Sequence, residues 1–239
     1  MLSGKKILGL VTARGGSKRL PRKNVLPFNG DPLIAWTIRA GLGSMYLDKV
    51  IVSSEDKQIQ RIAVDYYADL VIDRPQELAS DSASSVDVAL HALDHCADQG
   101  ETFDYLVLLQ PTSPLRESRH IDDALVLMKE KAARAVVGVC MTEHPTSWMG
   151  KISPTLSMDS FIEHGRFEGE DWSQEDADYQ INGAVYVIEV SELRDRRTFF
   201  PAREAYAYIM SRDESVDVDT HSHFLLAESL HRIRSLESP

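Results

Sequence analysis

Apolar runs alternate with amphipathic segments from residue 6 to residue 140, and this pattern restricts the fold more than any other feature. Uninterrupted apolar runs are typical of strands that are buried on both faces of a sheet. The runs predicted to be strands are 6–13, 49–53, 70–72, 105–109 and 134–140, and the segments predicted to be helices are 32–43, 55–67, 86–97 and 118–128. The alternation predicts an α/β fold, a three-layer α/β/α sandwich around a mostly parallel sheet. Ser118 is the expected N-cap of the fourth helix.

Residues 141–178 break this pattern, because prolines and glycines are scattered there among polar residues without a clear period. We interpret them as an excursion (a hairpin, a lid or a dimerisation arm) from one domain that covers residues 1–239. Regular patterns return at 181–189 and 205–210, which we predict to be strands. A terminal helix is predicted at 222–233, where apolar residues have helical spacing.

Composition argues against several classes of partner and site. A formal net charge of −11 disfavours nucleic acid or an anionic membrane as the main partner. Cys96 and Cys140 each lie in a periodic apolar segment, which indicates core thiols rather than a disulfide framework or a metal knuckle. The first apolar run is too short for a signal peptide or a membrane span, so we expect a cytoplasmic protein.

A basic turn, residues 14–23, follows the first predicted strand and reverses the sign of the local charge. Five of the chain's 26 basic residues lie there, beside Gly15 and Gly16. Glycines permit positive φ and let backbone N–H groups point together at an anion, and Arg and Lys supply the countercharge. We therefore predict a cradle for a polyphosphate, with a solvated basic loop as the alternative.

Two common nucleotide motifs do not match this turn. The Walker loop requires Gly-Lys-Ser/Thr at the start of a helix, and RGGSK has a different order and a proline soon after it. The dinucleotide motif requires three spaced glycines, and only two occur. An NAD-dependent oxidoreductase is therefore disfavoured. Candidate ligand-binding residues nevertheless lie near the ends of predicted elements, namely Arg14, Ser53, Arg74, Gln110 and Asn182.

A second candidate site is the pair Asp217 and Asp219 in SVDVDT. On an extended segment, residues two apart point the same way, so both carboxylates can face one Mg²⁺ ion. The alternative is an acidic turn in which Asp219 caps the last helix.

The block TARGGSKRLPRKN at 12–24 resembles the signature loop of the CMP-N-acylneuraminate (sialic acid) synthetases. Four more blocks resemble that family, in its order: DRPQELASDSASS at 73–85, LLQPTSPLR at 108–116, INGAVYV at 181–187 and SVDVDTHSHFLLAE at 215–228. The resemblance implies a nucleotide-diphospho-sugar transferase-like fold and a cytidylyltransferase that uses CTP and Mg²⁺. A sugar hydroxyl would attack the α-phosphorus, and pyrophosphate would leave.

The resemblance also implies roles for individual residues. Arg14, Lys18 and Lys23 would hold the triphosphate, with Arg14 and Lys23 catalytic together with Asp217 and Asp219. The remaining nucleotide-side residues would be Ser17 and Asn24, which orient the loop, and Arg74, Ser85 and Gln110. No general base is evident: the histidines on helices or in the excursion (His91, His95, His120, His144 and His164) have ordinary structural explanations. Activation of the hydroxyl by the metal is the preferred hypothesis.

The sugar side is less complete. Gln180 stands where the family often has an arginine, so recognition of the sugar carboxylate is expected to involve Arg116, Lys151 or Arg166. Asn182 and Gln110 would bind sugar hydroxyls. Phe199 and Phe200 match an aromatic pair near the acyl group, with core packing as the alternative.

N-acetylneuraminate is the expected acidic nine-carbon substrate. The alternatives are legionaminic acid, pseudaminic acid or an eight-carbon ulosonate, and a nucleotide-binding module without activity. The family resemblance also implies a homodimer, in which part of residues 141–178 contacts the site of the other subunit.

Overall fold

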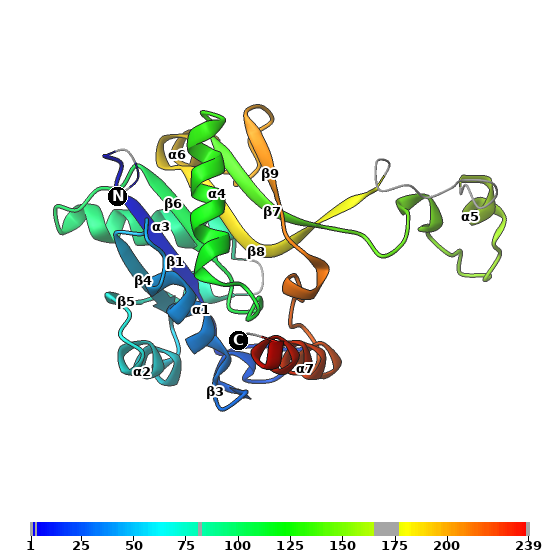
Figure 1. The fold of residues 1–239 in the computed structure, drawn as a ribbon, viewed down its shortest axis with the longest axis horizontal. Helices are drawn as coiled ribbons and strands as arrows, with labels where there is room; N and C mark the ends of the chain where they lie inside the picture. Colours follow the sequence, from blue (N-terminus) through cyan, green and yellow to red (C-terminus); the bar gives the residue numbers. More distant parts are fainter. Residues whose placement is uncertain (1, 3, 81–82, 165–176, 238–239) are drawn as a thin grey trace.

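The computed structural model describes residues 2, 4–80, 83–164 and 177–237. Its centre is one seven-stranded sheet of strand order β5-β4-β1-β6-β8-β7-β9 (Figure 1). The strands are β1 Ile7–Thr12, β4 Lys49–Ser54, β5 Leu70–Asp73, β6 Tyr105–Leu109, β7 Ala135–Met141, β8 Tyr179–Glu189 and β9 Ala205–Ile209. All neighbouring pairs are parallel except those of β8, which runs antiparallel to β6 and β7. The predicted mostly parallel sheet is confirmed.

Helices cover both faces of the sheet. They are α1 Leu33–Leu42, α2 Lys57–Asp65, α3 Ser85–Asp98, α4 Ser118–Glu130, α6 Val190–Arg196 and α7 His221–Glu237. Helix α2 begins where the Asp56 side chain accepts hydrogen bonds from the N–H groups of Gln58 and Ile59. The expected cap of α4 is wrong: Ser118 is already helical, and Glu117 is the N-cap in a capping box with His120.

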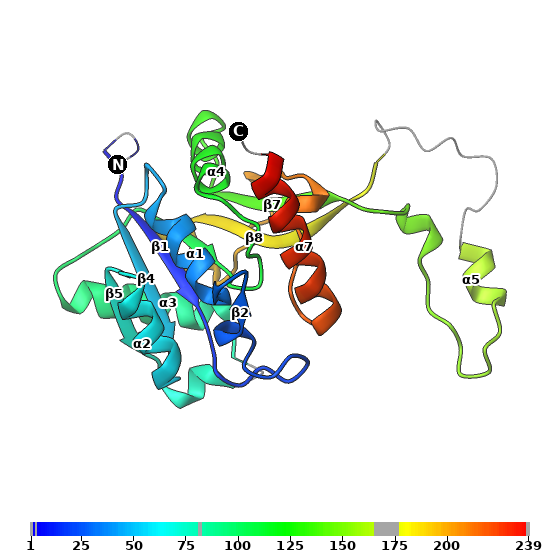
Figure 2. The same cartoon turned by 60° about the horizontal axis from the view of Figure 1, so that its bottom comes forward.

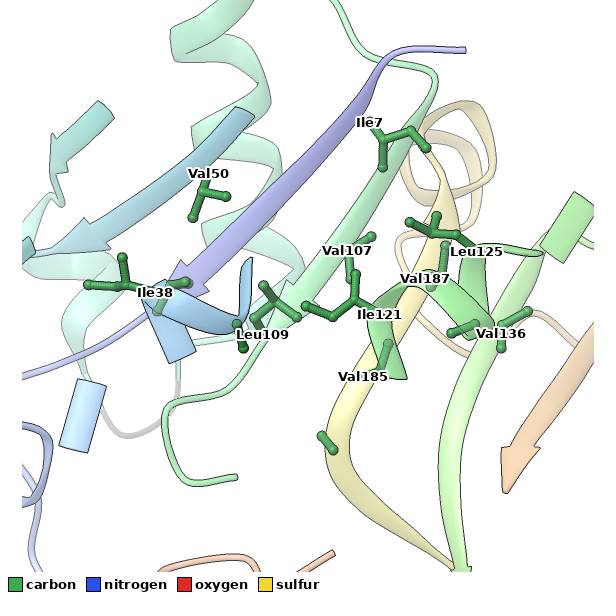
Figure 3. Packing of buried hydrophobic residues seen from close by; sticks show 14 of the residues in the cluster. Ile7, Ile38, Val50, Val107, Leu109, Ile121, Leu125, Val136, Val185 and Val187 are labelled. Carbon is green, nitrogen blue, oxygen red and sulfur yellow. The ribbon is translucent and has the colours of Figure 1, made fainter. Parts of the chain in front are cut away.

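Two apolar cores form because successive side chains of a strand point to opposite faces. Ile7 and Val11 pack with α1, α2 and α4, whereas Leu8 and Leu10 pack with α3 and α6. Figure 3 shows the first of these cores, where α1 and α4 lie on β1, β6, β7 and β8. The three-layer prediction is confirmed. Cys96 and Cys140 are free and buried, as predicted.

A third, smaller core joins the two ends of the chain. Phe28 lies in the short hairpin of β2 Pro27–Phe28 and β3 Asp31–Pro32, and its ring meets Phe224 of α7 edge-on with centroids 5.5 Å apart. Leu20 and Val218 belong to the same core. This packing holds the segment before α7 beside the turn that follows β1.

An arm, residues 142–178, leaves the sheet after β7 and returns at β8. Its described residues, 142–164 and 177–178, extend away from the body in both views (Figures 1 and 2). They include a short 3₁₀ turn, η3 Thr146–Trp148, and a short helix, α5 Asp159–His164. Large apolar side chains are exposed along the arm: Trp148, Met149, Ile152, Leu156, Met158 and Ile162. No helix in the described part of the chain is both long and apolar enough to cross a membrane.

Candidate active site

A pocket of about 640 Å³ opens beyond the carboxyl ends of the parallel strands β1, β5 and β6. Parallel α/β sheets usually bind ligands at this edge. The residues predicted for the nucleotide and the metal all line it: Arg14, Ser17, Lys18, Lys23, Asn24, Arg74, Ser85, Gln110, Asp217 and Asp219. Thus residues separated by almost the whole chain face one cavity.

Polar contacts hold the basic turn in place. The Asn24 side chain donates to the carbonyl oxygen of Arg14 (3.0 Å), and Glu55 accepts from the N–H of Gly15 (2.8 Å). Arg22 pairs with Asp56, the cap of α2. Because these contacts span both ends of the turn, its shape is set by the protein rather than by a ligand.

The structure explains Gly15 by close packing and not by the expected positive φ. Neither Gly15 nor Gly16 has a positive φ; among the basic residues of the turn, Arg22 does, at 58°. A Cβ atom on Gly15 would collide with the Asp56 carboxylate, whereas one on Gly16 would have no heavy atom within 4 Å. Gly15 is therefore required by close packing.

The acid segment, residues 215–219, is a loop that leads into α7. Val218 is fully buried, and its N–H donates to the carbonyl oxygen of Thr112 (2.7 Å). Asp217 and Asp219, on either side of it, face the pocket. The alternative role of Asp219 as a helix cap is wrong, because the Thr220 hydroxyl accepts from the N–H of His223 (3.3 Å) at the start of α7.

Two cations join the basic turn to the acid segment. Lys23 Nζ donates to Asp219 Oδ1 (3.1 Å) and to the carbonyl oxygen of Val218 (2.6 Å). Arg19 Nη2 lies 2.7 Å from Asp219 Oδ2. The positive and negative groups that the sequence separates by about two hundred residues therefore meet in one place.

The two carboxylates fit a magnesium ion. Mg²⁺ usually takes one or two protein carboxylates and completes its shell with water and phosphate oxygens. The described residues contain no group of three or more potential ligands from His, Cys, Asp or Glu. Desolvation raises the pKa of Asp217; a hydrogen bond with Thr112 opposes the increase, and the charge of Asp219 adds to it. A cation at this point would relieve that repulsion, and the guanidinium of Arg19 already occupies one oxygen of Asp219.

A buried carboxylate fixes the start of the acid segment. Glu214, which is 14% exposed, pairs with Arg119 of α4 and Arg234 of α7, the latter at 3.2 Å. It also accepts from the Ser211 hydroxyl (2.7 Å), and His120 Nε2 lies 3.3 Å away. Since Glu214 precedes Asp217 by three residues, these contacts tie the metal candidates to two helices.

The nucleotide-side candidates have different surroundings. Arg74 is buried, donates to Ser53 Oγ (3.2 Å) and to the carbonyl oxygens of Ala13 (2.9 Å) and Ser53, and joins the ends of β1 and β4. Burial lowers the pKa of Arg74. Ser85 is the first residue of α3 and lines the pocket, at a helix start where the Ser84 hydroxyl accepts from the N–H of Val86 (3.1 Å).

Most sugar-side candidates lie away from this pocket. Arg116 is buried beneath it and donates to the carbonyl oxygens of Gln110 (3.1 Å) and Ala184 (3.0 Å), and burial lowers its pKa to about 9. Asn182 is also buried: its amide donates to Ser215 Oγ (3.0 Å) and accepts from the N–H of Ala184 (3.0 Å). These two side chains hold β8 and the acid segment, which corrects the expectation that they face a sugar.

The aromatic and arm candidates are also spread out. Phe199 is buried in the core of α3 and α6, so core packing is the correct alternative for it, while Phe200 is half exposed beside Tyr186. Gln180 lies exposed on β8, and Lys151 lies in the arm. Arg166 is outside the described residues. Of the sugar-side candidates that the structure describes, Gln110 alone lines the pocket.

Two pocket residues, Arg19 and Thr112, had no individual role predicted from the sequence. In the sequence, Arg19 is one of five basic residues of the turn, and Thr112 is one of two hydroxyl residues between Pro111 and Pro114. Their positions follow from contacts across the chain. Among the described residues that line the pocket there is no histidine, and no general base is assigned.

Comparison with known proteins agrees with this geometry. A family model for cytidylyltransferases matches residues 8–151. The N-acylneuraminate cytidylyltransferase of Escherichia coli O18:K1:H7 is 34% identical over 229 residues, which are 95% of this chain and 52% of that protein. The CMP-N,N'-diacetyllegionaminic acid synthase of Legionella pneumophila is 32% identical over 94% of this chain and 96% of that protein. The chain thus spans about half of the first relative and nearly all of the second.

Solved structures show the same fold at low identity. A CMP:2-keto-3-deoxy-manno-octonic acid synthetase, solved with CTP, has a TM-score of 0.70 at 14% identity over 96% of this chain and 99% of that one. A 4-diphosphocytidyl-2C-methyl-D-erythritol synthase from Anaerococcus prevotii has a TM-score of 0.65 at 11% identity, over 96% of this chain and 100% of that one. The family model covers more than half of the chain, and the protein belongs to the cytidylyltransferase family.

Proposed function

We propose that this protein transfers the cytidylyl group of CTP to the anomeric hydroxyl of a nonulosonic acid. The sugar oxygen would form a bond to the α-phosphorus, the bond between the α-phosphorus and the bridging oxygen would break, and pyrophosphate would leave. The observation that carries the proposal is the shared pocket, in which the basic turn meets the acid segment through Lys23 and Arg19. The names of the relatives support the reaction class.

The basic turn would hold the phosphates. Arg14 and Lys18 line the pocket beside Ser17, so their charges would offset the negative charge that grows on the leaving pyrophosphate. The Lys23 side chain is 11% exposed and is bound to Asp219, so its charge would lie between the phosphates and the carboxylate of Asp219. Because Glu55, Asp56 and Asn24 already hold the turn, little reorganisation would be needed on binding.

Asp217 and Asp219 would hold Mg²⁺ together with phosphate oxygens. When bound, the ion would polarise the phosphoryl group and favour ionisation of the attacking hydroxyl. The protein's own contribution is to fix both carboxylates, through Val218 below them and Glu214 before them. This assignment explains why no histidine is needed in the pocket.

Arg74, Ser85 and Gln110 would contact the nucleoside, with Gln110 nearest to the sugar. Gln110 Oε1 lies 3.1 Å from the position of a Cβ atom on Gly183, which has a φ of +76°. A side chain at this position would crowd Gln110, so a glycine keeps the amide in place.

N-acetylneuraminate is the first candidate for the acid. The Escherichia coli relative is named for N-acylneuraminate, and other relatives are named for legionaminic and pseudaminic acids at 32% and 27% identity. Because Gln180 is uncharged, the carboxylate of the sugar requires a cation from elsewhere. Lys151 is exposed in the arm and has the required charge.

We also propose a homodimer that uses the arm. Its exposed apolar side chains need a partner surface, and the body of the same chain lies at the other end of the arm (Figures 1 and 2). The cytoplasmic location, and the expectation that neither nucleic acid nor membrane is a partner, stay predictions.

The direct test is incubation with CTP, Mg²⁺ and a panel of N-acetylneuraminate, legionaminic, pseudaminic and eight-carbon ulosonic acids. Pyrophosphate release would be followed, and the nucleotide product would be identified by mass. A CMP-linked product with one acid supports the proposal and names the substrate. Binding of CTP without turnover on any acid would instead favour a nucleotide-binding module.

A further inference from the structure

We propose that Arg19 is an internal counter-cation that occupies the metal-facing oxygen of Asp219 until a metal–nucleotide complex displaces it towards the phosphates. The inference depends on the proposed function, because it takes Asp219 as a metal ligand. It assigns to Arg19 a role of its own beyond its place among the basic residues of the turn.

Each oxygen of Asp219 has its own cation. Lys23 Nζ lies 3.1 Å from Oδ1, and Arg19 Nη2 lies 2.7 Å from Oδ2. A metal ion that binds Asp219 therefore meets a positive charge at either oxygen and is repelled by it. The surroundings of Lys23 and Arg19 determine which of the two ion pairs opens.

Lys23 is fixed and Arg19 is not. The Lys23 side chain is 11% exposed and donates a second hydrogen bond, of 2.6 Å, to the carbonyl oxygen of Val218. The Arg19 side chain is 70% exposed. Ion pairs at the surface contribute little to stability, because water competes for both charges. The ion pair of Arg19 is the one that opens, so Oδ2 becomes available to a metal while Lys23 keeps Asp219 oriented through Oδ1.

A displaced Arg19 has a destination in the same pocket. Arg19 lines the cavity together with Arg14, Ser17 and Lys18, where the triphosphate is proposed to bind. A guanidinium can bind phosphate oxygens through two parallel hydrogen bonds. Its movement therefore exchanges one anionic partner for another.

This exchange couples the metal to the nucleotide. Without nucleotide, a metal ion competes with Arg19 for Asp219. With nucleotide, the phosphates hold Arg19 and the competition is removed. Because coupling between two ligands is reciprocal, each would raise the affinity for the other.

The test measures Mn²⁺ binding to the whole chain, from the electron paramagnetic resonance signal of free Mn²⁺, without sugar and with or without CTP. Arg19→Gln removes the competitor, and Arg22→Gln is the matched control. Arg22 is a basic residue of the same turn, but it pairs with Asp56 and Gln58 rather than with the acid segment. Asp219→Asn identifies the binding site. Circular dichroism establishes that each variant is folded.

Without CTP, Arg19→Gln is expected to bind Mn²⁺ about threefold to fivefold more tightly than the wild type, since an exposed ion pair no longer competes. Arg22→Gln is expected to stay within about twofold of the wild type. With CTP, the advantage of Arg19→Gln should vanish or reverse, because the wild-type arginine has moved to the phosphates.

Two results would overturn the inference alone: an unchanged affinity in Arg19→Gln, or an equal gain in Arg22→Gln, which would indicate a general effect of charge. In both cases the wild type would still bind Mn²⁺ and the Asp219→Asn variant would not, so the metal site of the proposed function would stand. If the wild type binds no Mn²⁺ even with CTP, both the metal assignment and the role of Arg19 are wrong.

Discussion

The basic turn and the arm both follow the carboxyl end of a strand, β1 and β7 respectively, but the contacts that fasten the turn reach along it, whereas the described contact between the arm and the body, the pair of Glu143 and Arg212, lies at the base of the arm. Glu55 and Asp56 hold the turn from the loop between β4 and α2, and the carbonyl oxygen of Val218 holds it from the acid segment. The arm instead has exposed apolar side chains, such as Leu156 at 78% and Ile162 at 59%. In the proposed function, the turn is a catalytic loop that is ordered within one chain before the substrate arrives, and the arm takes its partner surface from a second copy. The predictions below test this contrast.

The largest effect is expected where the turn meets the acid segment. Asp219→Ala should lower kcat by roughly a thousandfold, because a metal ligand and the partner of Lys23 are lost together. Pyrophosphate release at saturating CTP and Mg²⁺ measures this. His95→Ala on α3, away from the pocket, is the control and should be close to the wild type. A histidine variant more damaging than Asp219→Ala would refute activation by a metal.

The next effect tests the arm. The double variant Leu156→Glu, Ile162→Glu places charges on exposed apolar positions and should raise the dimer dissociation constant about a hundredfold, at roughly 1–2 kcal/mol per interface residue. Light scattering across a concentration series measures it. Leu236→Glu, on α7 at 85% exposure, is the matched control. An active wild-type monomer at micromolar concentration would show that the arm needs no second subunit.

A smaller effect should separate the two glycines of the turn. Gly15→Ala forces the Asp56 carboxylate and the backbone of Gly15 apart and so displaces Arg14 beside it, and kcat/KM for CTP should fall roughly tenfold or more. Gly16→Ala adds the same methyl group into open space and should stay within about twofold, since surface changes are small. Equal losses in the two variants would mean that the turn is shaped by flexibility rather than by packing.

The smallest effect concerns acid stability. Burial acts to raise the pKa of Glu214, but the hydrogen bond from Ser211 and the charges of Arg119 and Arg234 outweigh it and lower the pKa. A lowered pKa in the folded state gives stability that is present above the unfolded value of about 4.3 and is lost as the pH falls through the folded value. Glu214→Gln should cost about 1–3 kcal/mol at pH 7 and make the dependence on pH below 5 less steep.

Urea unfolding at several pH values measures the free energy of unfolding for this comparison. Glu143→Gln is the control, because the pair between Glu143 and Arg212 is exposed and should contribute less than about 1 kcal/mol. Parallel pH curves for the wild type and Glu214→Gln would show that this carboxylate does not carry the acid sensitivity.

The regular elements were largely predictable because each has a local pattern. Strand β6 has the predicted bounds, and the other central strands differ by one or two residues. Helix α6, of seven residues, was missed because its packing through Leu193 depends on the sheet rather than on a repeated pattern. The antiparallel direction of β8 was also not readable, since a buried apolar run has the same composition in either direction.

The site residues also divide into those with a local sequence pattern and those whose position depends on tertiary packing. The basic turn and the pair Asp217 and Asp219 were identifiable as contiguous motifs, and they do share one pocket. Arg116, Asn182 and Phe199 have suitable chemistry, but their side chains point into the protein. The sequence by itself determined which elements form and which residues carry charge, because propensity and periodicity are local. Only the tertiary structure decided that Arg19 and Lys23 share the carboxylate of Asp219, because that contact depends on the packing of α7 and the β2–β3 hairpin, at opposite ends of the chain.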